Sequence, residues 1–244
     1  MSTLSVIFPA YQEEPYLGPA VESVLAALLD PNAVRSFDSV EVITVENGSK
    51  DATKQVALDL AAIHPQVKAL SIDTADYGKA LRTGLLAASG DIVVNFDVDL
   101  YDFDFLYRAV DLIEVPGGPT VVVATKRGEG SVDTRHWTRR LVTGVFTFLL
   151  RHGFGLKVSD THGMKAMRRV DVAPIAQQCI FGIDLFDTEL ILRVERAGYV
   201  TAELPCVIRE TRPARTKMIS RIWRSVKGLV RLWIALRREA RVKR

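Results

Sequence analysis

Short apolar runs alternate with amphipathic segments along the first half of this chain. The apolar runs predict strands at residues 4–8, 40–45, 67–72, 92–96 and 120–124. Apolar positions that recur every three or four residues predict helices at 17–29, 51–63 and 79–88. Strands that alternate with helices in this way indicate an α/β fold, with a mostly parallel central sheet flanked by helices.

The pattern changes beyond residue 125. We expect helices at 138–150 and 187–197, a strand at 200–208, and a long helix from residue 218 onward. The chain of 244 residues is long enough for one large domain, and we place its boundary after residue 214. Residues 1–214 would form the globular domain, and residues 215–244 a separate basic, amphipathic C-terminal helix.

Two aspartates, Asp97 and Asp99, follow the apolar run at 92–96. Ligands of open α/β sheets bind at the carboxyl ends of the strands, which is where this pair is expected to lie. Mg²⁺ is usually held by one or two carboxylates together with substrate phosphates. The pair is therefore a candidate metal and diphosphate site, and the alternative is an ordinary acidic turn before a helix.

Charge is distributed unevenly along the chain. Residues 215–244 contain 11 Lys or Arg and one acid, a net charge of +10, whereas the other 214 residues hold 21 bases and 28 acids, a net of −7. Apolar residues lie on one stripe of the C-terminal helix at 219, 222, 223, 226, 229, 230, 233 and 236. A basic amphipathic helix with tryptophans is typical of binding to an anionic membrane surface. The alternative is that the stripe packs on the protein's own core.

Other features limit the function classes. The apolar segment 141–150 is a second membrane candidate or a buried core helix, and it is too short to span a bilayer. The N-terminus has no basic region that would indicate a signal peptide. Gly78 and Lys79 begin a helix that, with Arg82, could attract anions, but neither a P-loop nor a dinucleotide fingerprint is present.

The loops that follow the predicted strands resemble glycosyltransferase family 2, whose fold is often called GT-A. The matching pieces are P-x-Y-x-E-E from residue 9, N-G-S-x-D-x-T from residue 47, G-K-x-x-x-x-G from residue 78, and the D-x-D at 97–99. Later segments at 159–166 and 186–190 are most similar to the polyprenol-phosphate sugar synthases of that family. Such synthases often carry S-D-x-x-S-G-F-R and F-x-x-E-L at these places.

This resemblance implies roles for particular residues. The nucleotide sugar would be bound by Pro9, Tyr11, Glu13, Glu46, Asp76, Lys79 and Asp97. Asp97 and Asp99 would hold Mg²⁺ or Mn²⁺. The chain departs from the family at Tyr101, where a metal-ligating glutamine is usual, and Asp102 is a candidate replacement. It also has His162 to Lys165 where S-G-F-R is expected.

The resemblance also bears on the acceptor. Asp187 begins a D-x-x-L-x-x-R sequence, which in family members that act on hydroxyls contains the general base. A phosphate acceptor is already largely anionic at neutral pH, and needs basic residues more than a base. Arg212 and Lys217 lie where the synthases have a basic segment that meets the acceptor phosphate. Asp187 could also be a carboxylate favoured by the helix dipole.

We therefore expect an inverting, metal-dependent glycosyltransferase that moves a sugar from a nucleoside diphosphate to polyprenyl phosphate. UDP is favoured over GDP because of the glycine-serine turn at 48–49. The protein would be cytoplasmic and peripheral on the inner face of the membrane, with no nucleic-acid partner. One alternative is a family 2 enzyme that acts on a hydroxyl with Asp187 as base. Another is a non-catalytic module that binds nucleotide or nucleic acid through the basic tail.

Overall fold

The structure, a computed structural model, describes residues 2–125, 153–158, 161, 163–183, 185–206 and 227–238. In this part of the chain a seven-stranded sheet has the order β3-β2-β1-β4-β6-β5-β7. The strands are β1 (Thr3–Ala10), β2 (Ser39–Asn47), β3 (Val67–Ile72), β4 (Ile92–Asn95), β5 (Val121–Thr125), β6 (Lys165–Arg168) and β7 (Thr201–Pro205). β6 runs antiparallel to both of its neighbours, and the other described pairs are parallel. The predicted mostly parallel sheet is therefore confirmed.

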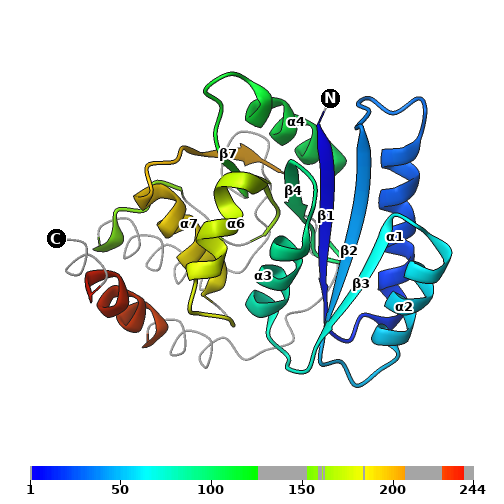
Figure 1. Cartoon of the computed structure of the whole chain (residues 1–244), viewed down its shortest axis with the longest axis horizontal. Helices are drawn as coiled ribbons and strands as arrows, with labels where there is room; N and C mark the ends of the chain where they lie inside the picture. The colour runs from blue at the N-terminus through cyan, green and yellow to red at the C-terminus, as the bar shows by residue number, and fades with distance from the viewer. Residues whose placement is uncertain are drawn as a thin grey trace, which may run out of the picture.

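Helices cover both faces of the sheet (Figure 1). α1 (Glu14–Leu29), α2 (Thr53–Ile63) and α4 (Phe103–Glu114) pack on one face. α3 (Tyr77–Ala87), α6 (Arg169–Gln178), α7 (Phe186–Arg196) and the helix at 227–238 pack on the other. β1 shows why both faces need cover: Val6 and Phe8 point into one core and Ile7 into the other, and all three are fully buried.

The predicted strands and helices of the first half are present, with ends that differ by a few residues. Three further elements, α4, β6 and α6, were not predicted from the sequence. β6 is only four residues long, K-A-M-R, and begins and ends with a basic residue, so its sequence has no strand-like alternation. α6 contains Pro174 and has a weak amphipathic pattern. The predicted helix at 138–150 lies outside the described residues.

Candidate active site

The loops that follow β1 and β2 form one hydrogen-bonded unit at the carboxyl edge of the sheet. The backbone N–H of Gln12 donates to Ser49 Oγ at 3.0 Å, and that of Glu13 donates to Thr53 Oγ1 at 2.8 Å. Pro9 is buried within β1, in register with Val45. Tyr11, beside this unit, is 37% exposed. Three of the predicted nucleotide-binding residues, Pro9, Tyr11 and Glu13, thus lie on one short segment whose position is fixed by the next loop.

Glu46 shapes the turn that follows β2. Its side chain is 3% exposed, and its two oxygens accept hydrogen bonds from the backbone N–H of Ser49 and from the Ser71 hydroxyl, the latter at 2.7 Å. Gly48 in this turn has a φ of +70°, a conformation that favours glycine. Glu46 therefore joins the ends of β2 and β3, and its predicted contact with the nucleoside stays a prediction.

Asp76 caps the start of α3 by accepting the backbone N–H of Lys79 at 2.9 Å. It also lies against Gly182, where an added Cβ would come within 2.1 Å of Asp76 Oδ2. Because of this close approach, the start of α3 and the segment before α7 share one surface. The predicted residues Asp76 and Lys79 are thus at the boundary between the first and second halves of the chain.

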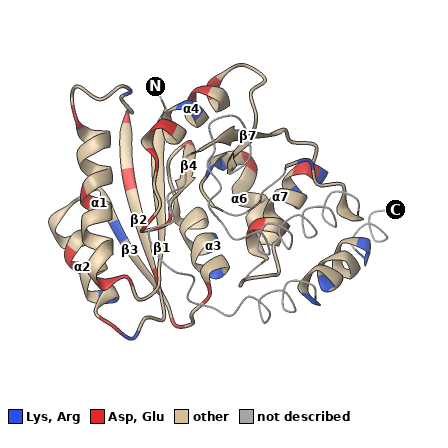
Figure 2. Cartoon of the chain, turned by 180° about the vertical axis from the view of Figure 1, so that it is seen from behind, with Lys and Arg blue, Asp and Glu red and all other residues tan. Residues whose placement is uncertain are grey.

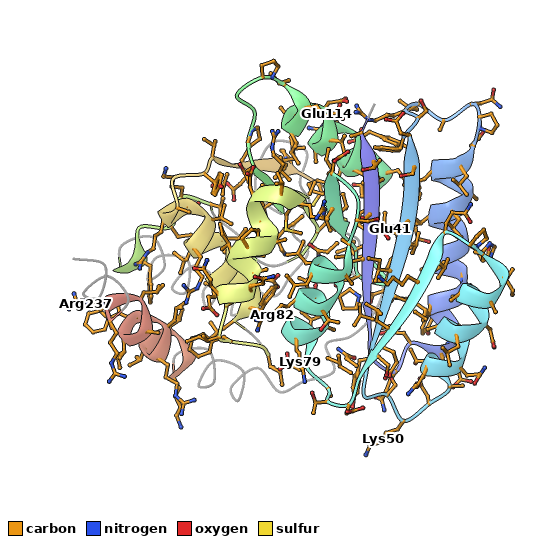
Figure 3. The ribbon with its side chains drawn as sticks, viewed as in Figure 1. Glu41, Lys50, Lys79, Arg82, Glu114 and Arg237 are labelled. Carbon is orange, nitrogen blue, oxygen red and sulfur yellow. The ribbon has the colours of Figure 1, made fainter. Side chains whose placement is uncertain are left out.

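Basic side chains near α3 have different roles. Figure 3 shows Lys79 and Lys50 along the edge at which the parallel strands end, and both are exposed. Arg82 instead lies between α3 and α6, where it donates to the carbonyl of Gln177 at 2.7 Å. Arg82 thus joins two helices through one N–H group, and the expectation that it attracts an anion stays a prediction.

The aspartate pair occupies a tight turn after β4. The backbones of Asp97 and Leu100 exchange two hydrogen bonds, of 3.1 and 2.9 Å. Asp97 is partly buried, and its Oδ1 accepts the hydroxyl of Tyr77 at 3.1 Å, whereas Asp99 is exposed. The turn thus holds one partly buried carboxylate, that of Asp97, and one exposed carboxylate, that of Asp99.

Neither Tyr101 nor Asp102 is a simple replacement for the missing metal-ligating glutamine. Tyr101 packs its ring against Phe8, Phe96 and Phe103, with centroid distances of 6.4, 6.2 and 5.9 Å. Asp102 caps α4 by accepting the backbone N–H of Phe105 at 3.1 Å. Asp102 already serves the fold in this way, so Asp97 and Asp99 carry the metal assignment.

α7 contributes a group of buried polar side chains to the site. Asp187, in the first turn of this helix, is 4% exposed, and its Oδ1 lies 3.0 Å from the ammonium nitrogen of Lys165. Lys165, on β6, is fully buried and also donates to the carbonyls of Gly163, at 2.6 Å, and Thr161, at 3.3 Å. The predicted catalytic residue Asp187 is thus half of an internal ion pair.

Glu189 holds the segment before α7. It is fully buried and accepts the backbone N–H groups of Ile180, at 3.1 and 2.9 Å, and Phe181, at 2.8 Å. The guanidinium of Arg193 also donates to it, at 2.8 Å. Buried carboxylates require such partners, because an unpaired charge in the interior is very costly. Glu189 therefore fixes the segment that meets Asp76 through Gly182.

Charges around Asp97 favour a divalent cation. Burial raises the pKa of the Asp97 carboxyl above its ordinary value; the Lys165 ammonium opposes this shift, and the Asp187 and Asp99 carboxylates add to it. Burial, followed by the Asp97 and Asp187 carboxylates, holds the pKa of Tyr77 well above its usual range, so its hydroxyl stays protonated. Three carboxylates against one ammonium leave an excess of two negative charges, which a divalent cation would balance.

The described residues hold no cluster of three or more His, Cys, Asp or Glu side chains that could bind a metal unaided. Asp97 and Asp99 nevertheless fit Mg²⁺ or Mn²⁺, because such ions commonly take one or two carboxylates and complete their shell with water and substrate phosphates.

Some apolar residues of the helix at 227–238 are buried against the core, and others are exposed to solvent. Leu229, Leu232 and Leu236 are at most 5% exposed and pack into the core beside α7. Val230 and Trp233, two members of the predicted stripe, are 55% and 38% exposed. The expectation that the whole stripe lies on a membrane is thus corrected, because part of it packs on the protein's own core.

The exposed part of this helix carries only basic charge. Figure 2 shows Lys and Arg but no acidic residue on it, and the guanidinium of Arg237 stacks on the Trp233 ring at 3.7 Å. None of the described helices is both long enough and apolar enough to cross a bilayer. Arg212, Lys217, the first part of the stripe and segment 141–150 lie outside the described residues.

Sequence reasoning missed Lys165, Tyr77 and Glu189. A signal existed for Lys165, because it stands where the resemblance expects an arginine. Tyr77 gave no signal of its own, since a tyrosine at a helix start is common. Glu189 did give one, because it is the glutamate of the F-x-x-E-L match at 186–190, but no role was assigned to it.

Comparisons with known proteins agree with this geometry. Residues 5–174 match the model of glycosyl transferase family 2. The chain is 25% identical over 222 residues to a dolichyl-phosphate beta-glucosyltransferase of Trichomonas vaginalis, covering 88% of this chain and 68% of that protein. It is 30% identical over 212 residues to the dolichyl-phosphate beta-glucosyltransferase of Drosophila melanogaster, covering 82% of this chain and 65% of the relative's length.

A solved structure shows the same fold. Glucosyl-3-phosphoglycerate synthase from Mycobacterium tuberculosis, in complex with Mn²⁺, uridine diphosphate and glucosyl-3-phosphoglycerate, has a TM-score of 0.68 and 23% identity. The match covers 95% of this chain and 80% of that structure. With the family model matched over most of the length and with the carboxylate turn at the end of β4, the chain belongs to glycosyl transferase family 2.

Proposed function

We propose that this chain is an inverting, metal-dependent glycosyltransferase that moves a sugar from a nucleoside diphosphate to a polyprenyl phosphate. The observation that carries the proposal is the turn bearing Asp97 and Asp99 at the end of β4, within electrostatic reach of the buried Asp187. The dolichyl-phosphate glucosyltransferases among its relatives support this acceptor class.

Asp97 and Asp99 would hold Mg²⁺ or Mn²⁺ together with the donor diphosphate. When bound, such an ion neutralises charge that develops on the leaving diphosphate. The exposed ammonium groups of Lys50 and Lys79 lie on the same edge and add positive charge there. The complex of the M. tuberculosis synthase with Mn²⁺ and uridine diphosphate supports this metal and favours UDP as the donor nucleotide.

In the reaction, an oxygen of the acceptor phosphate forms a bond to the anomeric carbon of the sugar. The bond from that carbon to the diphosphate oxygen breaks on the opposite face, and its electron pair leaves with the diphosphate. A phosphate monoester is already largely anionic near pH 7, its second pKa being about 6, so no strong base is needed. Asp187 would orient the acceptor side, while Arg212 and Lys217 would bind the acceptor phosphate.

A screen of nucleotide sugars tests this proposal directly. The purified protein is incubated with a polyprenyl phosphate, Mg²⁺ or Mn²⁺, and each of a set of UDP- and GDP-sugars, and the lipid is analysed by mass spectrometry. We expect the mass of one hexose to be added to the lipid with a UDP-sugar, and no addition in excess EDTA. Transfer that is unaffected by EDTA, or absent with every donor, would contradict the proposal.

A hydroxyl acceptor is the second candidate, and it is supported by the buried carboxylate of Asp187, the candidate base, which is paired with Lys165. If Asp187 takes a proton from a hydroxyl, Asp187→Asn should lower turnover by roughly 10²–10⁴-fold. With a phosphate acceptor the loss should be smaller, and Arg212→Ala and Lys217→Ala should be more damaging. A silent result for both basic substitutions, with transfer abolished in Asp187→Asn, would favour the hydroxyl reading.

We also propose that the outer side of the helix at 227–238 binds an anionic membrane surface. Its exposed Val230, Trp233 and Ile234, which are 55%, 38% and 40% exposed, lie among basic side chains. Tryptophan and basic residues on an exposed helical face are the features that interfacial helices use. Each Lys or Arg near an anionic leaflet contributes about 1 kcal/mol.

Substitution of exposed residues is a better test of membrane binding than truncation of the helix. Removing the helix would expose the core that Leu229 and Leu232 cover, whereas Trp233→Ser with Ile234→Ser changes only exposed positions. We expect this double variant to be released from phosphatidylglycerol-containing vesicles in a sedimentation assay. The control is Val34→Ser, at a 90% exposed position in the loop between α1 and β2, on the opposite side of the molecule (Figure 1). Equal binding by the two variants would contradict the membrane assignment.

A further inference from the structure

Lys165 makes its polar contacts inside the protein. Its ammonium group donates to the Gly163 carbonyl at 2.6 Å and to the Thr161 carbonyl at 3.3 Å. Its nitrogen also lies 3.0 Å from Asp187 Oδ1, an ion pair in which this buried oxygen accepts no hydrogen bond from the described residues. The Lys165 side chain is 0% exposed. Because the side chain is fully buried, its ammonium group is not accessible to a substrate phosphate.

The backbone on either side of Lys165 is shaped to deliver these acceptors. Gly163 has a φ of +96°, a conformation that glycine adopts readily, and its carbonyl also accepts the side-chain amide of Asn95 at 3.2 Å. Asn95 is directly opposite Lys165 in the pairing of β4 with β6. The ammonium group is thus held from the sheet, from the preceding loop and from α7.

These contacts connect Asp187 to the carboxylate turn. Lys165 pairs with Asp187, and it shares the Gly163 carbonyl with Asn95. Tyr77 donates to Asp97 Oδ1 at 3.1 Å and is hydrogen-bonded to the Asn95 side chain. A continuous chain of polar contacts therefore runs from the proposed metal ligand Asp97 to Asp187, and Lys165 is the cation within it.

We propose that Lys165 is a positioning residue that fixes the Asp187 carboxylate relative to the carboxylate turn, and that it does not contact the substrate itself. This role rests on the proposed function of the site as a glycosyl-transfer centre. Removing one partner of a buried ion pair leaves an uncompensated charge, which displaces the remaining group. Removing both charges leaves neither group uncompensated.

A double-mutant cycle tests this role. The variants are Lys165→Met, Asp187→Asn and the two combined, with Lys54→Met, at an exposed position of α2, as the control. Turnover and KM for donor and acceptor are measured with the best donor and acceptor pair, together with thermal unfolding. If no lipid acceptor is used, the rate at which water hydrolyses the nucleotide sugar is measured instead. The cycle can then be completed even if polyprenyl phosphate is not the acceptor.

If Lys165 acts through Asp187, Lys165→Met should lower kcat by about 100-fold, which is the scale expected when a group in the site is misplaced by about 1 Å. Donor KM should stay within about threefold of wild type. Adding Asp187→Asn should restore activity to about the level of Asp187→Asn alone, because the two effects are not independent.

Three results would overturn the proposal. The first is a double variant whose loss equals the product of the two single losses, which would indicate that Lys165 contacts the substrate independently of Asp187. The second is an acceptor KM raised strongly in Lys165→Met while kcat is kept. The third is a fall in thermal stability with no change in kcat, which would make the pair purely structural. If Lys165→Met does not fold, Asp187→Asn is compared with the double variant, which holds no unpaired buried charge. Similar kcat values of these two variants would support the proposal. A further large loss of kcat in the double variant would contradict it.

Discussion

The two sides of the site hold their charged residues by different means. On the donor side, formed by the loops after β1, β2 and β4 and by the start of α3, Glu46 and Asp76 accept backbone N–H groups of the turns that they shape. On the buried side, formed by β6 and α7, Lys165 pairs with Asp187, and Arg193 with Glu189. The donor side is therefore a set of loops joined by hydrogen bonds, whereas the buried side is part of the core.

This difference suggests what each side contributes to catalysis. Loops tied to one another by hydrogen bonds can keep their shape while a nucleotide and metal enter and leave. Buried ion pairs rarely add to stability when compared with a well-packed apolar core, so their value lies in fixing geometry. The donor side would thus supply binding, and the buried side orientation.

The largest effect is expected at the carboxylate turn. Asp99→Asn removes one of two protein ligands of the proposed metal and should lower turnover by about 10²–10⁴-fold, which corresponds to several kcal/mol of transition-state stabilisation. Thermal unfolding should be unchanged, because Asp99 is exposed. Asp104→Asn, at a surface ion pair on α4, is the control. Full turnover of Asp99→Asn at saturating Mn²⁺ would remove the metal assignment.

The buried side should respond through stability. Glu189→Gln leaves the Arg193 charge without its partner carboxylate and weakens the hydrogen bonds to Ile180 and Phe181. Breaking a buried pair costs about 3–5 kcal/mol. At about 2–4 °C for each kcal/mol in a chain of this size, the melting temperature should fall by about 6–20 °C.

The matched control for this stability measurement is Glu22→Gln, which removes an exposed ion pair with His64. Surface pairs contribute about 0–1 kcal/mol, so its melting temperature should move by only a few degrees. A similarly small shift in the melting temperature of Glu189→Gln would mean that the buried ion pair contributes no more to stability than a surface pair.

The donor side could be predicted from the sequence because its chemistry follows strand ends. The carboxyl ends of parallel strands meet at one edge of the sheet, so the sequence alone predicts that Glu13, Glu46 and Asp97 lie close together. The resemblance to family 2 then assigned their roles. Arg82 shows the limit of such reasoning, because its partner, the carbonyl of Gln177, belongs to a helix that the sequence pattern did not predict.

The buried side could not be predicted because burial of α7 depends on its neighbours. Its sequence, D-T-E-L-I-L-R from residue 187, has the charges that an exposed helical face would have. Residues from Phe186 to Val194 are nevertheless all buried, because the sheet, α6 and the helix at 227–238 pack around them. Leu232 gives the same lesson: it was not assigned to the apolar stripe, yet it is fully buried.

The smallest effect is expected for a hydrogen-bonded carboxylate away from the catalytic residues. Burial opposes ionisation of Glu41, but hydrogen bonds from Ser5, Ser89 and Gly90 outweigh it and lower the pKa of Glu41. A folded-state pKa below the unfolded value stabilises the protein above the unfolded pKa of about 4.3, and this contribution is lost as pH falls through the folded pKa.

Glu41→Gln should therefore destabilise the protein at pH 7 by about 1 kcal/mol, since the group is partly exposed to solvent. The difference from wild type should shrink below about pH 4. Urea unfolding of both proteins at pH 7, 5 and 3.5 measures it. A difference that stays constant over this range would show that the lowered pKa contributes nothing to stability.

The division of roles between the two sides is tested most directly by calorimetric titration of UDP into the wild-type protein, Asp97→Asn and Asp187→Asn, with and without Mn²⁺. We predict that UDP binds wild type with Mn²⁺ and binds about tenfold or more weakly without the metal or in Asp97→Asn. In Asp187→Asn with Mn²⁺, affinity should stay within about threefold of wild type. UDP binding that is independent of Mn²⁺, or that is lost as strongly in Asp187→Asn as in Asp97→Asn, would contradict the account.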